Sequence, residues 1–320
     1  MASTRSTGIR INRTIELLEG GQPIYYVGGH TGLAGTFHRR PKGALTGQHT
    51  PVLTYEQGRT DAGHWADYIN VGFEHGAFNV AGLDDYLHGM VDAGPTRSGH
   101  RTPTVIVEAP VNGISRAVVE ANAWQCQQLL ARGVHGIILC KANTPDAVAA
   151  FVEACRYPIN RLGVGAGLAT GMRGIASEDS AGHVWGVDAD TYIEKADPWP
   201  LNPDGELFLG IKIESKAALP YVEEIMQVPG VGFAEVGPGD MALTLGIRSL
   251  TDPWPREMVE IEQRVKEACA ASGVYFHPFT GYAAPADFPA LIDAGALVIT
   301  APDEEIARVG RAHSGRKMPV

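Results

Sequence analysis

The stretch Phe208–Gly246 decides the fold and reads FLGIKIESKAALPYVEEIMQVPGVGFAEVGPGDMALTLG. It holds two short apolar runs, Phe208–Ile213 and Val231–Val236, and each run is followed by a carboxylate. Glu214 follows the first run directly, and Asp240 follows the second run after a Gly-Pro-Gly turn. Short apolar runs that end at turn residues are typical of buried β-strands.

The segment between the two runs is expected to be a helix. Ser215 is a good N-cap, and the Ala, Leu and Val residues after it predict an amphipathic helix. Parallel strands joined by a helix end on the same side of a sheet. Glu214 and Asp240 should therefore meet at one rim and share a hard divalent cation such as Mg²⁺ or Mn²⁺. The alternative is that Asp240 only caps the helix that begins at Met241.

Length and composition favour a soluble enzyme. The chain has 320 residues, 44% of them apolar, which suffices for one large barrel domain. A formal net charge of −10 without a basic run argues against nucleic acid or an anionic membrane as partner. Four cysteines without CxxC spacing indicate reduced thiols, and the N-terminus lacks the apolar centre of a signal peptide. A cytoplasmic location is expected.

Strands alternate with helices along the whole chain. The expected strands are residues 23–27, 67–73, 104–107, 136–140, 208–213, 231–236, 274–276 and 296–300. Beyond the helix that follows Ser215, the expected helices are residues 14–19, 83–93, 115–131, 145–155, 257–271 and 284–294. Eight such strands predict an α/β protein, a single-domain (β/α)8 TIM barrel over 1–320 with its active site at the C-terminal rim. An open doubly wound sheet is the alternative, but no GxGxxG follows the first strand.

Three segments fall outside this alternation. Residues 1–20 are expected to form a polar N-terminal arm, and 31–62 a long loop. Residues 161–207, rich in glycine and then in polar residues and tryptophan, are expected to be an insertion at the same rim as the acids, as a lid.

Other polar residues lie at strand ends, where barrel enzymes place their chemistry. His75 follows the second strand and could act as a general base, or be a hydrogen-bonded structural residue. Glu108, Lys141 and Lys212 lie at or near the same rim. A Glu108–lysine ion pair is one interpretation, and a desolvated lysine that forms a Schiff base is the other. Lys212 alternates in register with Glu214, so both side chains should point the same way.

The motifs GIKIES and VGPGDMALTLG, with NVGFEHGAFN before them, resemble those of the HpcH/HpaI-type, class II metal-dependent pyruvate aldolases. The similarity covers roughly residues 20–310, with 171–207 as extra material. It implies a (β/α)8 barrel in which Glu214 and Asp240 hold Mg²⁺, Mn²⁺ or Co²⁺. It further implies a metal-bound pyruvate-type enolate, with His75 exchanging the proton. The substrates would be a 2-oxo acid and an aldehyde, and the protein would be a homo-oligomer, such as a hexamer built from dimers that swap a C-terminal helix.

The sequence departs from this family at three positions. The family's arginine on the third strand aligns with Glu108, and two family acids align with Gly72 and Ala131. A negative charge beside a bound carboxylate is unfavourable unless a cation intervenes, and Lys141 and Lys212 are the candidates. Lys212, Lys141 and Glu108 are therefore predicted substrate contacts. The alternatives are a decarboxylase or cyclising enzyme on the same barrel, a Schiff-base lyase, and a non-catalytic binding barrel.

Overall fold

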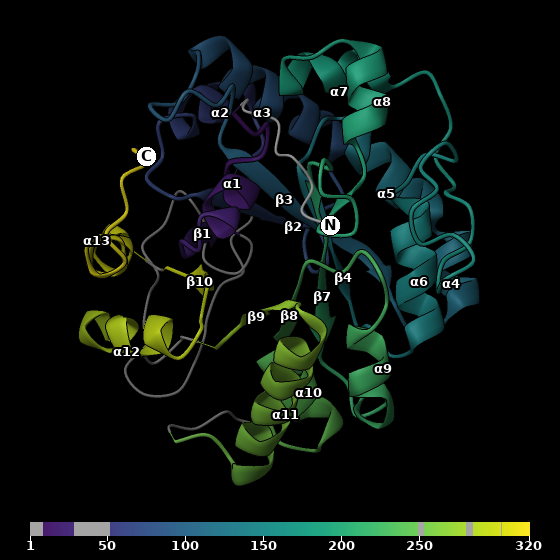
Figure 1. The fold of residues 1–320 in the computed structure, drawn as a ribbon, viewed down its shortest axis with the longest axis vertical. Helices are drawn as coiled ribbons and strands as arrows, with labels where there is room; N and C mark the ends of the chain where they lie inside the picture. Colours follow the sequence, from purple (N-terminus) through teal and green to yellow (C-terminus); the bar gives the residue numbers. More distant parts are fainter. Residues whose placement is uncertain (1–8, 29–51, 249–252, 280–283, 302) are drawn as a thin grey trace.

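A ring of parallel strands forms the centre of the protein, with helices around it (Figure 1). The computed structural model describes residues 9–28, 52–248, 253–279, 284–301 and 303–320. Within them, eight parallel strands form one sheet in the order β10-β1-β2-β3-β4-β7-β8-β9. These strands are β1 (Ile24–Gly28), β2 (Tyr68–Gly72), β3 (Thr104–Asn112), β4 (Gly136–Cys140), β7 (Gly210–Ile213), β8 (Phe233–Val236), β9 (Tyr275–His277) and β10 (Val298–Thr300).

The two end strands come together through side chains. His277 Nε2 on β9 and Thr300 Oγ1 on β10 are hydrogen-bonded at 2.7 Å. The sheet is therefore a nearly closed barrel, and the predicted (β/α)8 fold is confirmed. None of the described helices combines the length and the hydropathy that crossing a membrane requires.

Helices follow most strands and cover the outside of the barrel (Figure 1). They are α2 (Tyr55–Asp61), α3 (Val80–Ala93), α4 (Arg116–Ala121), α5 (Ala123–Leu130), α6 (Pro145–Ala154), α9 (Val222–Met226), α10 (Pro238–Thr244), α11 (Arg256–Ser272), α12 (Phe288–Asp293) and α13 (Glu304–His313). Thr144 caps α6 and Pro145 begins it, as the sequence predicts. The C-terminal helix α13 was not predicted, and it packs on its own barrel through Ile306 and Ala307.

Apolar side chains fill the N-terminal half of the barrel. One cluster joins strand residues to Ile15 and Leu18 of α1 (Arg13–Glu19), which lies over this end (Figure 1). The members of this apolar layer on the barrel strands are Ile24, Tyr26, Tyr68, Ile106, Ile138, Phe233 and Val298. The helix expected over 14–19 is present as α1, but this part of the segment is not a polar arm, because the apolar side chains of α1 are buried against the barrel. Residues 1–8 lie outside the described part.

A polar layer lies one step further along the strands. Because successive side chains of a strand point to opposite faces, the residue two positions after an inward residue also points inward. This rule places seven polar or thiol-bearing residues together above the apolar layer. They are Asn70, Glu108, Cys140, Lys212, Glu235, His277 and Thr300. The barrel therefore changes from apolar to charged toward the C-terminal ends of its strands.

The insertion 161–207 lies at the N-terminal end of the barrel, so the prediction of a lid at the C-terminal rim is wrong. Trp185 Nε1 of α7 (Glu178–Trp185) donates to the carbonyl of Gly133 at 2.8 Å. Tyr192 Oη of α8 (Ala189–Lys195) donates to the carbonyl of Leu130 at 2.9 Å. Both carbonyls lie just before β4, at the end where the strand begins. Burial of aromatic side chains fixes the insertion there.

A two-stranded sheet of β5 (Pro198–Trp199) and β6 (Leu207–Phe208) ends this insertion. Trp199 stacks on Tyr275, with ring centroids 5.7 Å apart, and packs on the apolar layer. The insertion thus closes the barrel beside α1.

Several element boundaries differ from the prediction. The helix expected over 115–131 is broken at Asn122, whose Nδ2 donates to the Val118 carbonyl at 2.9 Å. Ser215 does not cap a helix, because its Oγ donates to Asn143 instead. Pro220 lies in a 3₁₀ turn, Leu219–Tyr221, so the helix α9 begins only at Val222.

Two further differences affect the rim. β3 runs to Asn112, so Glu108 lies inside the strand and does not follow it. The loop expected over 31–62 contains α2, and its first part, 31–51, lies outside the described residues.

Candidate metal centre

Glu214 is buried directly after β7, at the C-terminal end of the barrel. Its Oε1 accepts a hydrogen bond of 2.7 Å from the backbone N–H of Lys141. Lys141 has φ of 50°, a left-handed conformation that is strained for a residue with a side chain. Gly237 makes room on the other side, because a Cβ there would lie 2.0 Å from Glu214 Oε2. The position of Glu214 thus depends on the residues that follow the two neighbouring strands, Lys141 after β4 and Gly237 after β8.

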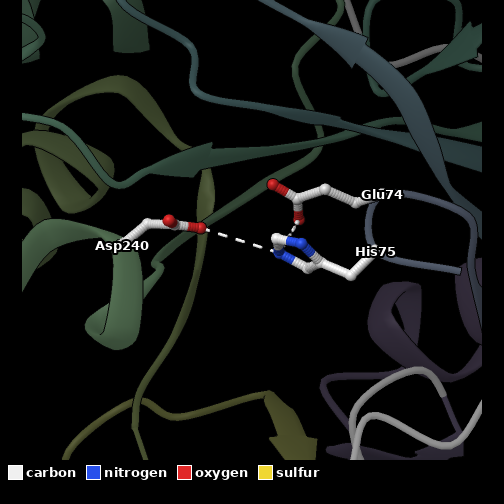
Figure 2. A group of neighbouring side chains, drawn as sticks. All are labelled: Glu74, His75 and Asp240. Atoms are coloured by element: carbon white, nitrogen blue, oxygen red, sulfur yellow. Dashed lines mark ion pairs between the residues drawn. The ribbon is translucent and has the colours of Figure 1, made fainter. Parts of the chain in front are cut away.

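The alternative that Asp240 caps a helix beginning at Met241 is wrong, because α10 begins at Pro238 with Gly237 as its N-cap, and Asp240 lies inside the first turn. Its Oδ2 lies 3.7 Å from His75 Nε2, and its Oδ1 lies 3.9 Å from Lys141 Nζ. Figure 2 shows the His75 ring between the carboxylates of Asp240 and Glu74. Asp240 therefore takes part in the same cluster as His75 and Lys141.

Glu74 links the acids, and the sequence reasoning missed this role. One of its oxygen atoms and one ligand atom each of His75 and Asp240 lie within 4.8 Å of one another. The same holds for Glu74, Cys140 and Glu214. Glu214 and Asp240 are thus joined through Glu74. The signal in the sequence was the position of Glu74 directly after the second strand, beside His75.

Lys212 lies at the centre of the polar layer, surrounded by carboxylates. Its Nζ lies 3.1 Å from Glu74 Oε2, 3.2 Å from Glu108 Oε2 and 3.9 Å from Glu235 Oε1. The Glu108–lysine ion pair that the sequence suggested is therefore present. Asn70 Nδ2 donates to the other Glu108 oxygen at 2.7 Å, and Glu235 in turn contacts His277 Nδ1.

The protonation of these groups follows from their neighbours. Burial raises the pKa of Glu214 to about 8; Glu74 and Asp240 add to the rise, while Lys212 and the Lys141 N–H oppose it. Burial alone would lower the pKa of Lys212, but Cys140, Glu108, Glu235 and Glu214 raise it well above its usual value. Lys212 is therefore a fixed ammonium group.

The donor set fits a divalent cation. In the described part of the chain, five carboxyl groups face two lysines, Lys141 and Lys212; they belong to Glu74, Glu108, Glu214, Glu235 and Asp240. Glu74 Oε1 is buried and has no hydrogen-bond partner among the described residues. Carboxylate oxygens are the ligands that Mg²⁺ and Mn²⁺ prefer, and a divalent cation would offset the excess negative charge.

The structure brings the predicted site residues together at one end of the barrel. His75, Glu108, Lys141, Lys212, Glu214 and Asp240 are connected by the contacts described above. Residues that the sequence reasoning did not single out also join them, namely Glu74, Cys140, Glu235 and His277. This arrangement defines a (β/α)8 barrel with an acidic, lysine-containing site at its C-terminal rim.

Residues 107–299 match the family described as HpcH/HpaI aldolase/citrate lyase. This match covers more than half of the chain, and the protein belongs to that family. A 2-keto-3-deoxy-L-rhamnonate aldolase from Klebsiella pneumoniae is 31% identical over 129 residues, which are 40% of this chain and 41% of that relative. A hydroxypyruvate/pyruvate aldolase from Sagittula stellata is 31% identical over 137 residues, 43% of this chain and 46% of the relative. The chain thus spans less than half the length of these curated relatives.

The fold is similar to that of solved structures over nearly the whole chain. An HpcH/HpaI aldolase/citrate lyase family protein from Burkholderia cenocepacia J2315 has a TM-score of 0.64 at 20% identity, covering 94% of this chain and 96% of that one. At this level of identity the likeness supports the fold alone.

Proposed function

We propose that this protein is a divalent-metal-dependent carbon–carbon lyase, an aldolase that acts on a 2-oxo acid. One observation carries the proposal: Glu214, Asp240 and Glu74 converge with His75 and Lys212 at the C-terminal rim of a family barrel. Both curated relatives named above are aldolases of 2-oxo acids, which supports the substrate class.

Glu214 and Asp240 would hold the ion, with Glu74 between them. Mg²⁺ and Mn²⁺ suit these oxygen ligands, and Co²⁺ is the third candidate. When bound, such an ion supplies a Lewis acid that polarises the carbonyl oxygen of the substrate.

His75 is suited to move the proton that aldol cleavage requires. Its side chain is 37% exposed, whereas the adjoining Glu74 side chain is 4% exposed, so the imidazole faces the open rim. Glu74 and Asp240 flank Nε2 at 3.5 and 3.7 Å and orient the ring. An imidazole so placed can accept the proton of a substrate hydroxyl as the carbon–carbon bond breaks and return it in the reverse direction.

Lys212 would supply the positive charge toward the substrate carboxylate. Glu108 stands where the resemblance places the family's arginine, and it holds Lys212 at 3.2 Å. Because the pKa of Lys212 is raised, its amine is protonated and is a poor Schiff-base nucleophile. Lys141 Nζ, at 3.9 Å from Asp240, is a second cation at the rim.

The test is activity before and after metal removal. The protein is stripped with EDTA and then assayed for pyruvate formation from 4-hydroxy-2-oxo acids, with Mg²⁺ or Mn²⁺ added back. We expect activity to be lost on stripping and to return with the ion. Full activity in the metal-free protein would contradict the proposal.

A decarboxylase is the second candidate, and Glu108 in place of an arginine favours altered chemistry at the substrate site. Oxaloacetate offered with and without an aldehyde separates the two, because CO2 release without an aldol product supports the decarboxylase. A homo-oligomer of hexameric size and a cytoplasmic location stay predictions.

A further inference from the structure

Cys140 lies inside the barrel beside the acids of the candidate metal centre. It is the last residue of β4, and its side chain is fully buried. Strand alternation places it in the polar layer, two residues after Ile138 of the apolar layer. A cysteine that only packs is typically surrounded by apolar side chains. The neighbours that act electrostatically on Cys140 are instead Lys212, Glu74, Glu108 and Glu214.

The positions of three donor atoms suit one ion. Cys140 Sγ and one oxygen each of Glu74 and Glu214 lie within 4.8 Å of one another. Zinc binds sulfur at about 2.3 Å and carboxylate oxygen at about 2.0–2.2 Å, so two ligands of one ion lie at most about 4.5 Å apart. The three atoms lie close to this span, and we expect side-chain rotation on metal binding to bring them to ligand distance.

Glu74 provides independent evidence for a ligand at this place. Its Oε2 is occupied by Lys212 at 3.1 Å. Its Oε1 is buried without a hydrogen-bond partner among the described residues, and the side chain is 4% exposed. A buried carboxylate oxygen without a partner is costly, and a cation would satisfy it.

We propose that Cys140 Sγ is a ligand of the metal, together with Glu74 and Glu214, and that the site therefore takes a borderline transition metal such as Zn²⁺ or Co²⁺ in preference to Mg²⁺. Sulfur ligands select such ions, whereas carboxylates alone suit Mg²⁺ and Mn²⁺. Binding exchanges the thiol proton for the metal, and the proton leaves to solvent. This inference rests on the proposed function for the presence of a divalent ion and for Glu214 as a ligand. It differs in the class of metal and in placing Cys140 and Glu74 beside Glu214, because Asp240 belongs to the other group of donors, with Glu74 and His75.

The test is the absorption spectrum of the metal-free protein titrated with Co²⁺. A thiolate bound to Co²⁺ gives an intense charge-transfer band in the near ultraviolet, whereas oxygen ligands give only weak visible bands. We expect the intense band in the wild type and its loss in Cys140→Ser. The matched control is Cys269→Ser, since Cys269 is also buried but lies on α11 against Met226, and it should keep the band.

Competition between metals gives a second readout. Zn²⁺ affinity should fall at least about tenfold in Cys140→Ser, and Mg²⁺ affinity should change less than about twofold. Co²⁺ binding by the wild type without the thiolate band overturns the inference and leaves the proposed function intact. Absence of Co²⁺ binding overturns the inference and also removes the metal site from the proposed function. The wild-type spectrum decides even if the serine variant does not fold.

Discussion

Lys212 Nζ lies 3.2 Å from Glu108 Oε2 inside the barrel, and both side chains are only 2% exposed. Glu74 and Glu235 complete the surroundings of the ammonium group. A buried lysine with three carboxylate neighbours is favourable only while all of them stay together, because breaking a buried ion pair leaves uncompensated charge. Lys212 therefore contributes both to the stability of the barrel, through its buried ion pairs, and to the proposed site, as its central cation.

Substitution of Lys212 tests this link. Lys212→Met leaves three buried carboxylates without their cation and should cost about 3–5 kcal/mol of unfolding free energy. Lys216→Met, two residues beyond Glu214 and exposed, should change it by no more than about 0.5 kcal/mol. Denaturant unfolding measures both variants. Equal stability of the two would show that the buried cluster does not depend on Lys212.

Gly237 should be required for the position of Glu214. A Cβ at residue 237 would lie 2.0 Å from Glu214 Oε2, so Gly237→Ala must displace the carboxylate. Gly239, in the same turn of α10, has no atom within 4 Å of the corresponding Cβ. We expect Mn²⁺ affinity, measured by calorimetry, to fall about tenfold or more in Gly237→Ala and to stay unchanged in Gly239→Ala. Unchanged affinity in both would mean that Glu214 is not a ligand.

His75 should affect turnover and leave stability intact. His75→Gln removes the imidazole and should lower kcat about 10²- to 10⁴-fold, the usual contribution of a general acid–base. His88 on α3 has similar exposure, 39% against 37%, so His88→Gln is the control. Thermal melting should place both variants close to the wild type. Wild-type kcat in His75→Gln would remove this residue from the mechanism.

His135 should make stability fall below neutral pH. Burial, with a smaller effect of His100, lowers the pKa of His135 to about 3, whereas in the unfolded chain it is about 6.5. Between these values the unfolded state binds more protons, so the stability contribution is complete above pH 6.5 and falls by about 1.4 kcal/mol per pH unit below it.

His135→Asn should remove this part of the pH dependence. The asparagine oxygen can accept the Val105 N–H that His135 Nδ1 now accepts at 3.2 Å. Denaturant unfolding at pH 7.0 and pH 5.0 should show a smaller loss in the variant than in the wild type. His64, whose pKa burial lowers to about 4, contributes a loss of the same sign in both proteins. Equal losses would show that His135 takes up its proton in the folded state.

The sequence predicted the barrel and the rim residues for a physical reason. Apolar strands alternate with helices, and parallel strands place their ends together, so Glu214, Asp240 and His75 could be placed from their positions after the strands. Lys212 followed from strand alternation with Glu214, whereas Glu108 was placed at the expected end of the third strand, which in fact continues to Asn112.

Other features depend on tertiary contacts that local patterns do not carry. The insertion is held at the N-terminal end of the barrel by Trp185 and Tyr192, whose carbonyl partners belong to the distant segment before β4. The link between the acids through Glu74 depends on where the residues after β2 turn inward. Cys140 lies near Glu74 and Glu214 because of the register in which β4 pairs with β7, and the sequence of either strand alone does not give this register.

Metal binding by calorimetry tests the central claim most directly. Metal-free wild-type protein titrated with Mn²⁺ should bind the ion, and Glu214→Gln should bind it at least about 100-fold more weakly, because the variant lacks a carboxylate ligand. Equal binding by the two proteins, or no binding by the wild type, would contradict a metal centre at the C-terminal end of this barrel.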